Sequence, residues 1–139
     1  PMLEVGCDYG RSCCLLADAR PDVPLLLIDP FPDPVARQRC VEELWRRRRP
    51  FTLYPLRTAD VPLRNIPLLS LLHLNGGHTV PDISIDCTLL PFVLPGGILA
   101  VHDYRRESLP DVTEVVDQAT REEWDLLTVA GYLGIWRRQ

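Results

Sequence analysis

Short apolar runs alternate with amphipathic segments along the whole chain, and this alternation limits the possible folds more than any other feature. Residues 23–29, VPLLLID, are continuously apolar up to the last position, as expected for a strand buried on both faces. In the next segment Asp33 and Pro34 suit a helix start, and Val41 and Leu44 share one face. Repeated strand and helix units predict a mostly parallel sheet with helices on both faces.

The same patterns predict the other elements of a single α/β domain over residues 1–139. We expect strands at 2–5, 23–29, 51–56, 67–74 and 97–103, with two closing strands around Gly131. We expect helices at 11–19, at 33–50, from Pro81 to the LPGG turn at 94–97, and through Val112 to Ala119.

Composition excludes several classes of protein. The cysteines are odd in number and form no CxxC pair, which favours a reduced, cytoplasmic protein and disfavours zinc (Cys7, Cys13, Cys14, Cys40 and Cys87). The net charge of −4 does not favour a nucleic-acid partner. The longest apolar stretch is far shorter than the ~20 residues of a membrane span, so we expect no membrane partner. Nothing in the sequence indicates an oligomeric state.

Two features lie where a parallel sheet binds its ligands, just beyond the strand ends. Gly6 and Gly10 follow the first expected strand; glycine allows positive φ and close approach of a ligand, and the next helix offers free N–H groups. Asp29 ends the second strand, where a carboxylate can accept hydrogen bonds from ribose hydroxyls. The alternatives are a tight turn without a ligand and an aspartate that only caps a turn.

Together with residues 71–104, LLHLNGGHTVPDISIDCTLLPFVLPGGILAVHDY, these features resemble the class I S-adenosylmethionine-dependent methyltransferases. The similarity extends to the branch that includes macrocin and sugar O-methyltransferases, with IDGxHxY and GGxxxxHDY segments. It implies a Rossmann-like, mostly parallel seven-stranded sheet with an antiparallel last strand. It also implies that this chain lacks the upstream helix and lid elements that close the cofactor pocket in relatives.

The resemblance assigns cofactor-binding positions. It implies that the methionine and ribose parts of S-adenosylmethionine are lined by Glu4, Gly6, Cys7 and Gly10, with Ser12 near the carboxylate of the cofactor. Asp29 is expected to hold the ribose hydroxyls. Adenine is expected to meet Thr58, Ala59 or Asp60, with Asp60 preferred.

A metal site is less well supported by the same comparison. Metal-using relatives hold a divalent cation between an Asp after strand four and the Asp that ends strand five. This chain has Asn75 at the first position and Asp103 at the second. Because Mg²⁺ favours carboxylate and water ligands, the neutral amide leaves the use of Mg²⁺ open.

Three residues are candidates for the base that removes a proton from a hydroxyl acceptor. His78 is the first choice, because imidazole titrates near neutral pH, and His102 or Asp103 is the second. The alternative for His78 is a histidine that only holds a loop in place. His73, inside the fourth strand, is expected to pack in the core.

The leading hypothesis is methyl transfer to an oxygen of a small-molecule or sugar-like acceptor. One alternative is a non-catalytic or incomplete methyltransferase-fold remnant. The other is an NAD(P)-dependent oxidoreductase, although the G-x-G-x-x-G spacing of such enzymes is absent.

Overall fold

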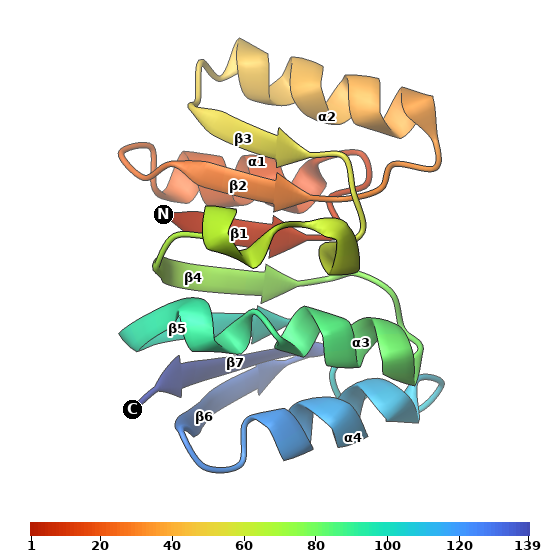
Figure 1. Ribbon diagram of the computed structural model, residues 1–139, viewed down its shortest axis with the longest axis vertical. Helices are drawn as coiled ribbons and strands as arrows, with labels where there is room; N and C mark the ends of the chain where they lie inside the picture. Colours follow the sequence, from red (N-terminus) through yellow and green to blue (C-terminus); the bar gives the residue numbers. More distant parts are fainter.

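Seven strands form one sheet in the computed structural model, which describes residues 1–139 (Figure 1). The strands are β1 (Met2–Val5), β2 (Leu25–Ile28), β3 (Phe51–Tyr54), β4 (Leu69–Leu74), β5 (Val93–Val101), β6 (Trp124–Ala130) and β7 (Leu133–Arg138). Their order is β3-β2-β1-β4-β5-β7-β6; the first five are parallel, and β7 is antiparallel to both of its neighbours. The predicted α/β sheet with an antiparallel last strand is confirmed.

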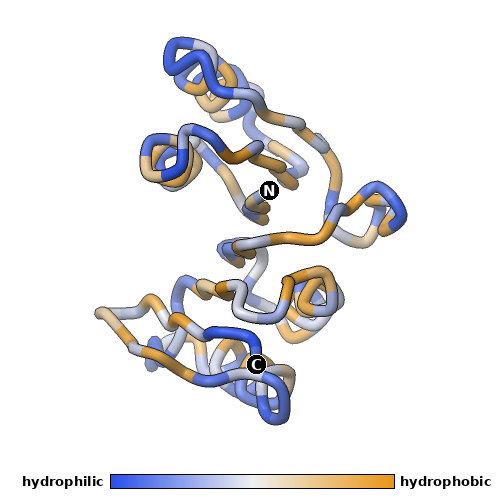
Figure 2. The backbone as a smooth tube through the Cα atoms, turned by 90° about the vertical axis from the view of Figure 1, so that its left-hand side faces the viewer, coloured by the Kyte–Doolittle hydropathy of each residue, from blue (hydrophilic) through white to orange (hydrophobic).

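Four α-helices cover the two faces of the sheet, as Figure 2 shows in a view along the strands. Helices α1 (Arg11–Ala19) and α2 (Pro34–Arg46) pack on one face, and α3 (Val80–Cys87) and α4 (Pro110–Ala119) pack on the other. Three short 3₁₀ helices, η1 (Thr58–Asp60), η2 (Leu63–Asn65) and η3 (Leu90–Phe92), complete the structure. None of the helices combines the length and the apolar character that crossing a membrane requires.

Local chemistry sets the start of α2 as the sequence predicts. The Asp33 side chain accepts a hydrogen bond of 2.9 Å from the N–H of Val35. Pro34 lies in the first turn. Backbone N–H groups in the first turn have no partner within the helix, so the missing N–H of proline costs no hydrogen bond there. Near the other end, Glu43 and Arg47 form an i,i+4 ion pair at 2.7 Å.

The expected helix from Pro81 to the LPGG turn is wrong at its C-terminal end. Helix α3 ends at Cys87, and β5 already begins at Val93, so that Gly96 and Gly97 lie within the strand. Pro91 explains the early end, because proline in a helix interior removes a hydrogen bond and clashes with the preceding turn. The pairing of β4 with β5 shifts register in this region, which accommodates Gly96 at a φ of +79°.

The core consists of two layers, one on each face of the sheet. Along β1 the side chains alternate, so that Leu3 and Val5 join the layer under α3 and α4, whereas Met2 joins the layer under α1 and α2. Glu4 is fully buried on the same face as Met2. The parallel strands all point to the right in Figure 1, so the loops after them meet at one edge of the sheet.

Candidate active site

The glycine turn between β1 and α1 is held close against the end of β4. Gly6 and Gly10 both have a φ of +80°, a conformation that residues with a side chain rarely adopt. A Cβ at Gly6 would lie 1.9 Å from the carbonyl oxygen of Asn75, and a Cβ at Gly10 would lie 2.9 Å from the Cα of Cys40. Packing therefore requires glycine at both positions, independently of any ligand.

Asp29 fastens this turn to the end of β2. Its Oδ2 accepts hydrogen bonds from the N–H groups of Cys7 at 2.7 Å and Asp8 at 2.9 Å. Its Oδ1 accepts one from the N–H of Phe31 at 2.6 Å. An ionised carboxylate offers about four lone-pair positions, so the 7% exposed Asp29 keeps acceptor capacity for a further donor.

A cavity of about 600 Å³ opens at this edge of the sheet. Residues from the ends of four strands line it, among them Gly6, Asp29, Thr58 and Asn75. Its size lies within the range of pockets that bind small molecules and cofactors. The cavity therefore lies where a parallel sheet of this topology is expected to bind a ligand.

The structure brings some of the expected cofactor residues to this cavity and leaves others away from it. Gly6 and Asp29 line it, whereas Cys7 and Gly10 contribute to the turn without lining the cavity. Glu4 is 0% exposed and does not reach the cavity. Its Oε1 accepts a short hydrogen bond from the hydroxyl of Ser12 instead.

At the expected adenine end, the preference for Asp60 is not matched by the structure. Thr58 and Ala59 line the cavity, and Asp60 does not. The three residues form η1, whose tight turn buries Thr58 and leaves Asp60 exposed.

Asp86 also lines the cavity, and no motif in the sequence predicts a role for it. It lies on α3, is 6% exposed, and accepts a hydrogen bond of 2.5 Å from the hydroxyl of Thr58. Burial raises the pKa of Asp86 to about 6, with a further increase from Asp82 and a partly opposing effect of the Thr58 hydrogen bond. One sequence signal could have identified Asp86: it is a carboxyl group near Ile83 and other apolar residues of the expected helix.

A second polar group lies beyond the ends of β4 and β5. The buried Asp103 accepts a hydrogen bond at Oδ1 from Arg106 at 2.7 Å. Its Oδ2 lies 2.8 Å from Nε2 of His78 and 3.1 Å from Nδ1 of His102. All three residues predicted as candidate bases are thus in one cluster.

The environment of Asp103 keeps this carboxyl group ionised. Although burial opposes ionisation, the hydrogen bond from Arg106 and the neighbouring imidazoles of His102 and His78 hold the pKa of Asp103 below its ordinary value. A neutral His78 then donates from Nε2 and leaves Nδ1 as an acceptor. Asp103 can orient the imidazole in this way, and the half-exposed His78 can accept a proton.

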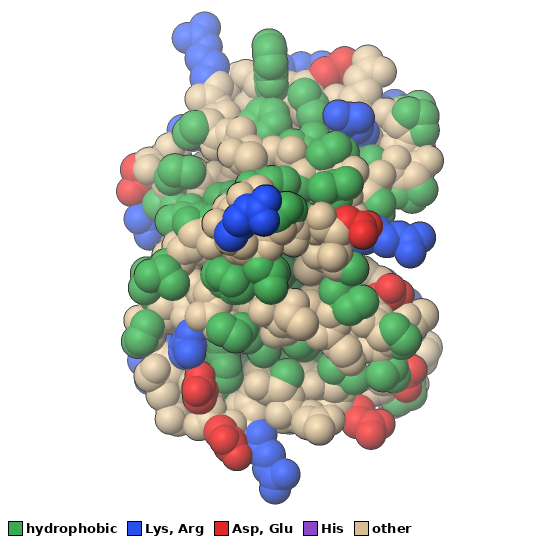
Figure 3. Space-filling view, in the orientation of Figure 1, with side chains coloured by type: hydrophobic (Ala, Val, Ile, Leu, Met, Phe, Trp, Pro, Cys, Tyr) green, Lys and Arg blue, Asp and Glu red, His purple; other side chains and the backbone are tan.

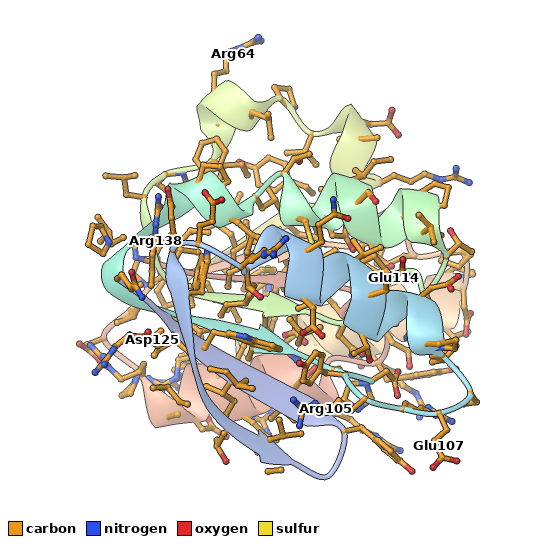
Figure 4. The ribbon with its side chains drawn as sticks, turned by 90° about the horizontal axis from the view of Figure 1, so that it is seen from below. Arg64, Arg105, Glu107, Glu114, Asp125 and Arg138 are labelled. Carbon is orange, nitrogen blue, oxygen red and sulfur yellow. The ribbon has the colours of Figure 1, made fainter.

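The loop that carries this cluster runs from β5 to α4. Arg105 and Glu107 lie on it, and Figure 4 shows Arg105 beside the turn between β6 and β7. The N–H of Tyr104 donates a hydrogen bond of 2.9 Å to the carbonyl of Tyr132 in that turn.

On the face that carries α3 and α4, acidic and basic side chains are interspersed and form no patch of one sign (Figure 3).

Asn75 and Asp103 do not fit a Mg²⁺ site as they are arranged. The Asp103 oxygens face two imidazoles and a guanidinium group, and the positive charge of Arg106 at 2.7 Å opposes a second cation. Asn75 directs its side-chain N–H toward the carbonyl of Gly6, at the long distance of 3.4 Å. Mg²⁺ needs oxygen ligands in an octahedral arrangement, which these two residues do not supply.

The sheet order and the cavity at the strand ends define a Rossmann-like α/β protein of the kind that binds nucleotide cofactors. The family described as methyltransferase domain matches residues 3–104, and the chain belongs to this family. The class I methyltransferase resemblance seen in the sequence is therefore confirmed. A search of curated proteins gives no match.

Several solved structures share the fold. The structure of CalS11, a TDP-rhamnose 3'-O-methyltransferase, superposes with a TM-score of 0.82 and 14% identity, over 98% of this chain and 70% of that one. The O-methyltransferase NovP gives 0.77 and 22%, over 99% and 71%. An O-methyltransferase family protein from Burkholderia thailandensis gives 0.65 and 13%, over 99% and 50%. At these identities the similarity establishes the fold.

Proposed function

We propose that this chain transfers a methyl group from S-adenosylmethionine to an oxygen of a small-molecule or sugar-like acceptor. One observation carries the proposal: residues 75–77 line both the cavity that contains Asp29 and a smaller hollow that contains His78 and His102. In our proposal the cofactor site and the proton acceptor therefore lie on the two sides of one turn. Membership of the methyltransferase family supports this combination.

The residues around the cavity fit this cofactor. Asp29 retains acceptor capacity for ribose hydroxyls after its three backbone contacts. Helix α1 begins after Gly10, outside the cavity lining, without a side-chain cap, so its first N–H groups are free to bind an anion. Pro30 and Ile85 add apolar surface to the cavity wall.

The bound cofactor supplies a methyl group on a positively charged sulfur. The chain has to align the acceptor and remove the proton of its hydroxyl group. In our proposal Nδ1 of His78 accepts this proton, and Asp103 holds the imidazole through Nε2 and stabilises its charged form. His102 contacts the same Asp103 oxygen and is the second candidate for the base.

The names of the structural neighbours support oxygen as the acceptor atom, since CalS11 and NovP are both O-methyltransferases. The description of CalS11 as a TDP-rhamnose 3'-O-methyltransferase supports a sugar-like acceptor. The acceptor class remains part of the proposal.

Calorimetric titration with S-adenosylhomocysteine and, separately, with NADH tests the cofactor, each with and without Mg²⁺. We expect micromolar binding of S-adenosylhomocysteine alone, without a dependence on Mg²⁺. For the variant Asp29→Ala, which should bind S-adenosylhomocysteine less tightly, the matched control is Asp22→Ala. This control removes an exposed carboxylate paired with Arg20. Absence of binding would overturn the proposal.

A second assay tests turnover. Wild-type protein and S-adenosylmethionine are incubated with a panel of hydroxyl acceptors, and the S-adenosylhomocysteine formed is measured. Formation that depends on the acceptor supports catalysis. Cofactor binding without turnover on any acceptor would favour the non-catalytic remnant.

A further inference from the structure

A cluster of soft and anionic side chains lies beneath the glycine turn, on the face of the sheet covered by α1 and α2. A carboxylate oxygen of Glu4 and the Sγ atoms of Cys7 and Cys13 all lie within 4.8 Å of one another. The three residues are 0%, 3% and 0% exposed. None of them lines the cofactor cavity or contacts Asp103, so this cluster is a separate place in the fold.

Glu4 has one oxygen that the protein leaves without a partner. Its Oε1 is bonded by Ser12 and lies 3.1 Å from Nδ1 of His73. Its Oε2 is buried and has no hydrogen-bond donor, even among the neighbouring thiols. The Sγ of Cys7 lies instead 3.8 Å from the carbonyl of Glu4 and 3.9 Å from that of Ile28. A buried carboxylate oxygen without a donor is costly, and a bound cation would remove this cost.

A third thiol lies next to Cys13 and outside this group of three. Cys40 on α2 is fully buried and interacts with Cys13, and its Sγ packs against Gly10. Thiolate and carboxylate groups are ligands that Zn²⁺ takes in tetrahedral sites, with Zn–S distances of about 2.3 Å. Sulfur atoms in such a site are about 3.8 Å apart. The Cys7 and Cys13 sulfurs, at no more than 4.8 Å, need only small side-chain shifts to reach this spacing.

The cysteine spacing along the sequence disfavours zinc, but the fold brings together residues from separate elements. We propose that Glu4, Cys7 and Cys13 bind one Zn²⁺ ion, with the adjacent thiol of Cys40 as the fourth ligand. Three metal–sulfur bonds form as the three thiols each release one proton, and Oε2 of Glu4 binds as a carboxylate. The ion joins β1, the glycine turn, α1 and α2 at one point. It holds the turn that borders the cofactor cavity, and it takes no part in the methyl transfer.

The test uses the whole chain, freed of metal under reducing conditions and titrated with Co²⁺ as a spectroscopic probe and then with Zn²⁺. We expect one equivalent of Co²⁺ with thiolate-to-metal charge-transfer absorption, which one equivalent of Zn²⁺ removes. Cys7→Ser and Cys13→Ser are expected to lower the affinity at least ~10-fold, since even residues that only orient a ligand change affinity by that much.

Two cysteines provide matched controls. Cys14 is adjacent to Cys13 in the sequence but lies outside the group formed by Glu4, Cys7 and Cys13, as does the half-buried Cys87, and neither of them interacts with Cys13 as Cys40 does. Cys14→Ser and Cys87→Ser should therefore leave Co²⁺ binding unchanged. Absence of charge-transfer absorption in the wild type, or equal loss of binding in the control variants, would overturn the proposal.

A measurement on the wild type keeps the test decisive if the Cys13 variant does not fold. Alkylation of the metal-free and Zn²⁺-loaded chain under mild denaturation is followed for each cysteine by mass spectrometry. Zn²⁺ should slow the modification of Cys7, Cys13 and Cys40 and leave that of Cys87 unchanged. Equal rates with and without Zn²⁺ would contradict the site.

Discussion

Asp103 lies 2.8 Å from Nε2 of His78, a residue 25 positions earlier in the sequence and on the neighbouring strand end. This contact engages Nε2 of His78 and leaves Nδ1 as the nitrogen that can accept a proton. Because Arg106 and His102 contact the same carboxylate, Asp103 is better suited to orient a base than to act as one.

Replacing Asp103 with Asn should lower the rate of methyl transfer on a hydroxyl acceptor by about 100-fold, because the imidazole loses its anionic partner and general-base catalysis contributes 10²–10⁴-fold. His78→Gln should have an effect of at least similar size. The affinity for S-adenosylhomocysteine should change little, as calorimetry can verify. A fall in affinity that matches the fall in rate would argue for a structural role.

Asp29→Ala removes the acceptor of two backbone hydrogen bonds from the glycine turn and of a third from the N–H of Phe31. Charge-assisted bonds of this kind contribute about 1.5–3 kcal/mol each, and water replaces part of the loss. We therefore expect the free energy of unfolding to fall by about 3 kcal/mol and cofactor affinity to fall at least ~10-fold. Urea unfolding and calorimetry measure the two effects. Unchanged affinity would contradict the proposed role of Asp29 in the cofactor site.

Gly6→Ala should destabilise the fold by about 3 kcal/mol or more, because the new Cβ would lie 1.9 Å from the Asn75 carbonyl oxygen at a φ of +80°. Gly131→Ala is the matched control: its φ is +61°, and a Cβ there meets no atom within 4 Å. Gly131→Ala should lower the free energy of unfolding only through the left-handed backbone conformation, by about 1–2 kcal/mol. Equal losses in urea unfolding would mean that the contact with Asn75 is unimportant.

The free energy of unfolding should depend on pH through Asp86. Its folded pKa of about 6 lies above the ordinary value of 3.8, so the fold favours the protonated form. The stabilisation is fully present below about pH 4 and is lost as pH rises through about 6, by up to about 3 kcal/mol.

Asp86→Asn should remove this component, since an amide does not titrate in this range. The difference in unfolding free energy between variant and wild type, measured from about pH 4 to about pH 7.5, isolates it from other groups. A difference that is constant with pH would contradict the raised pKa of Asp86.

The alternation of apolar runs and amphipathic segments was sufficient to predict the class of sheet and the succession of strands and helices along the chain. The start of α2 at Asp33 and Pro34 was also predictable, because capping depends on residues a few positions apart. The predicted C-terminal end of α3 was wrong because the segment from Cys87 to Val93 carries apolar residues. Such residues suit a helix, a 3₁₀ turn and a strand alike.

The sequence by itself determined the strands, most helices and the positions of Gly6, Asp29, His78 and Asp103 at strand ends, since these follow from local periodicity and chain order. Only the tertiary structure decided that Asp60 faces away from the cavity and that Asp86 faces into it. It also decided that Cys40 lies beside Cys13 near the buried Glu4. The physical reason is that crossover connections and helix packing set such distances, and a one-dimensional pattern contains no measure of them.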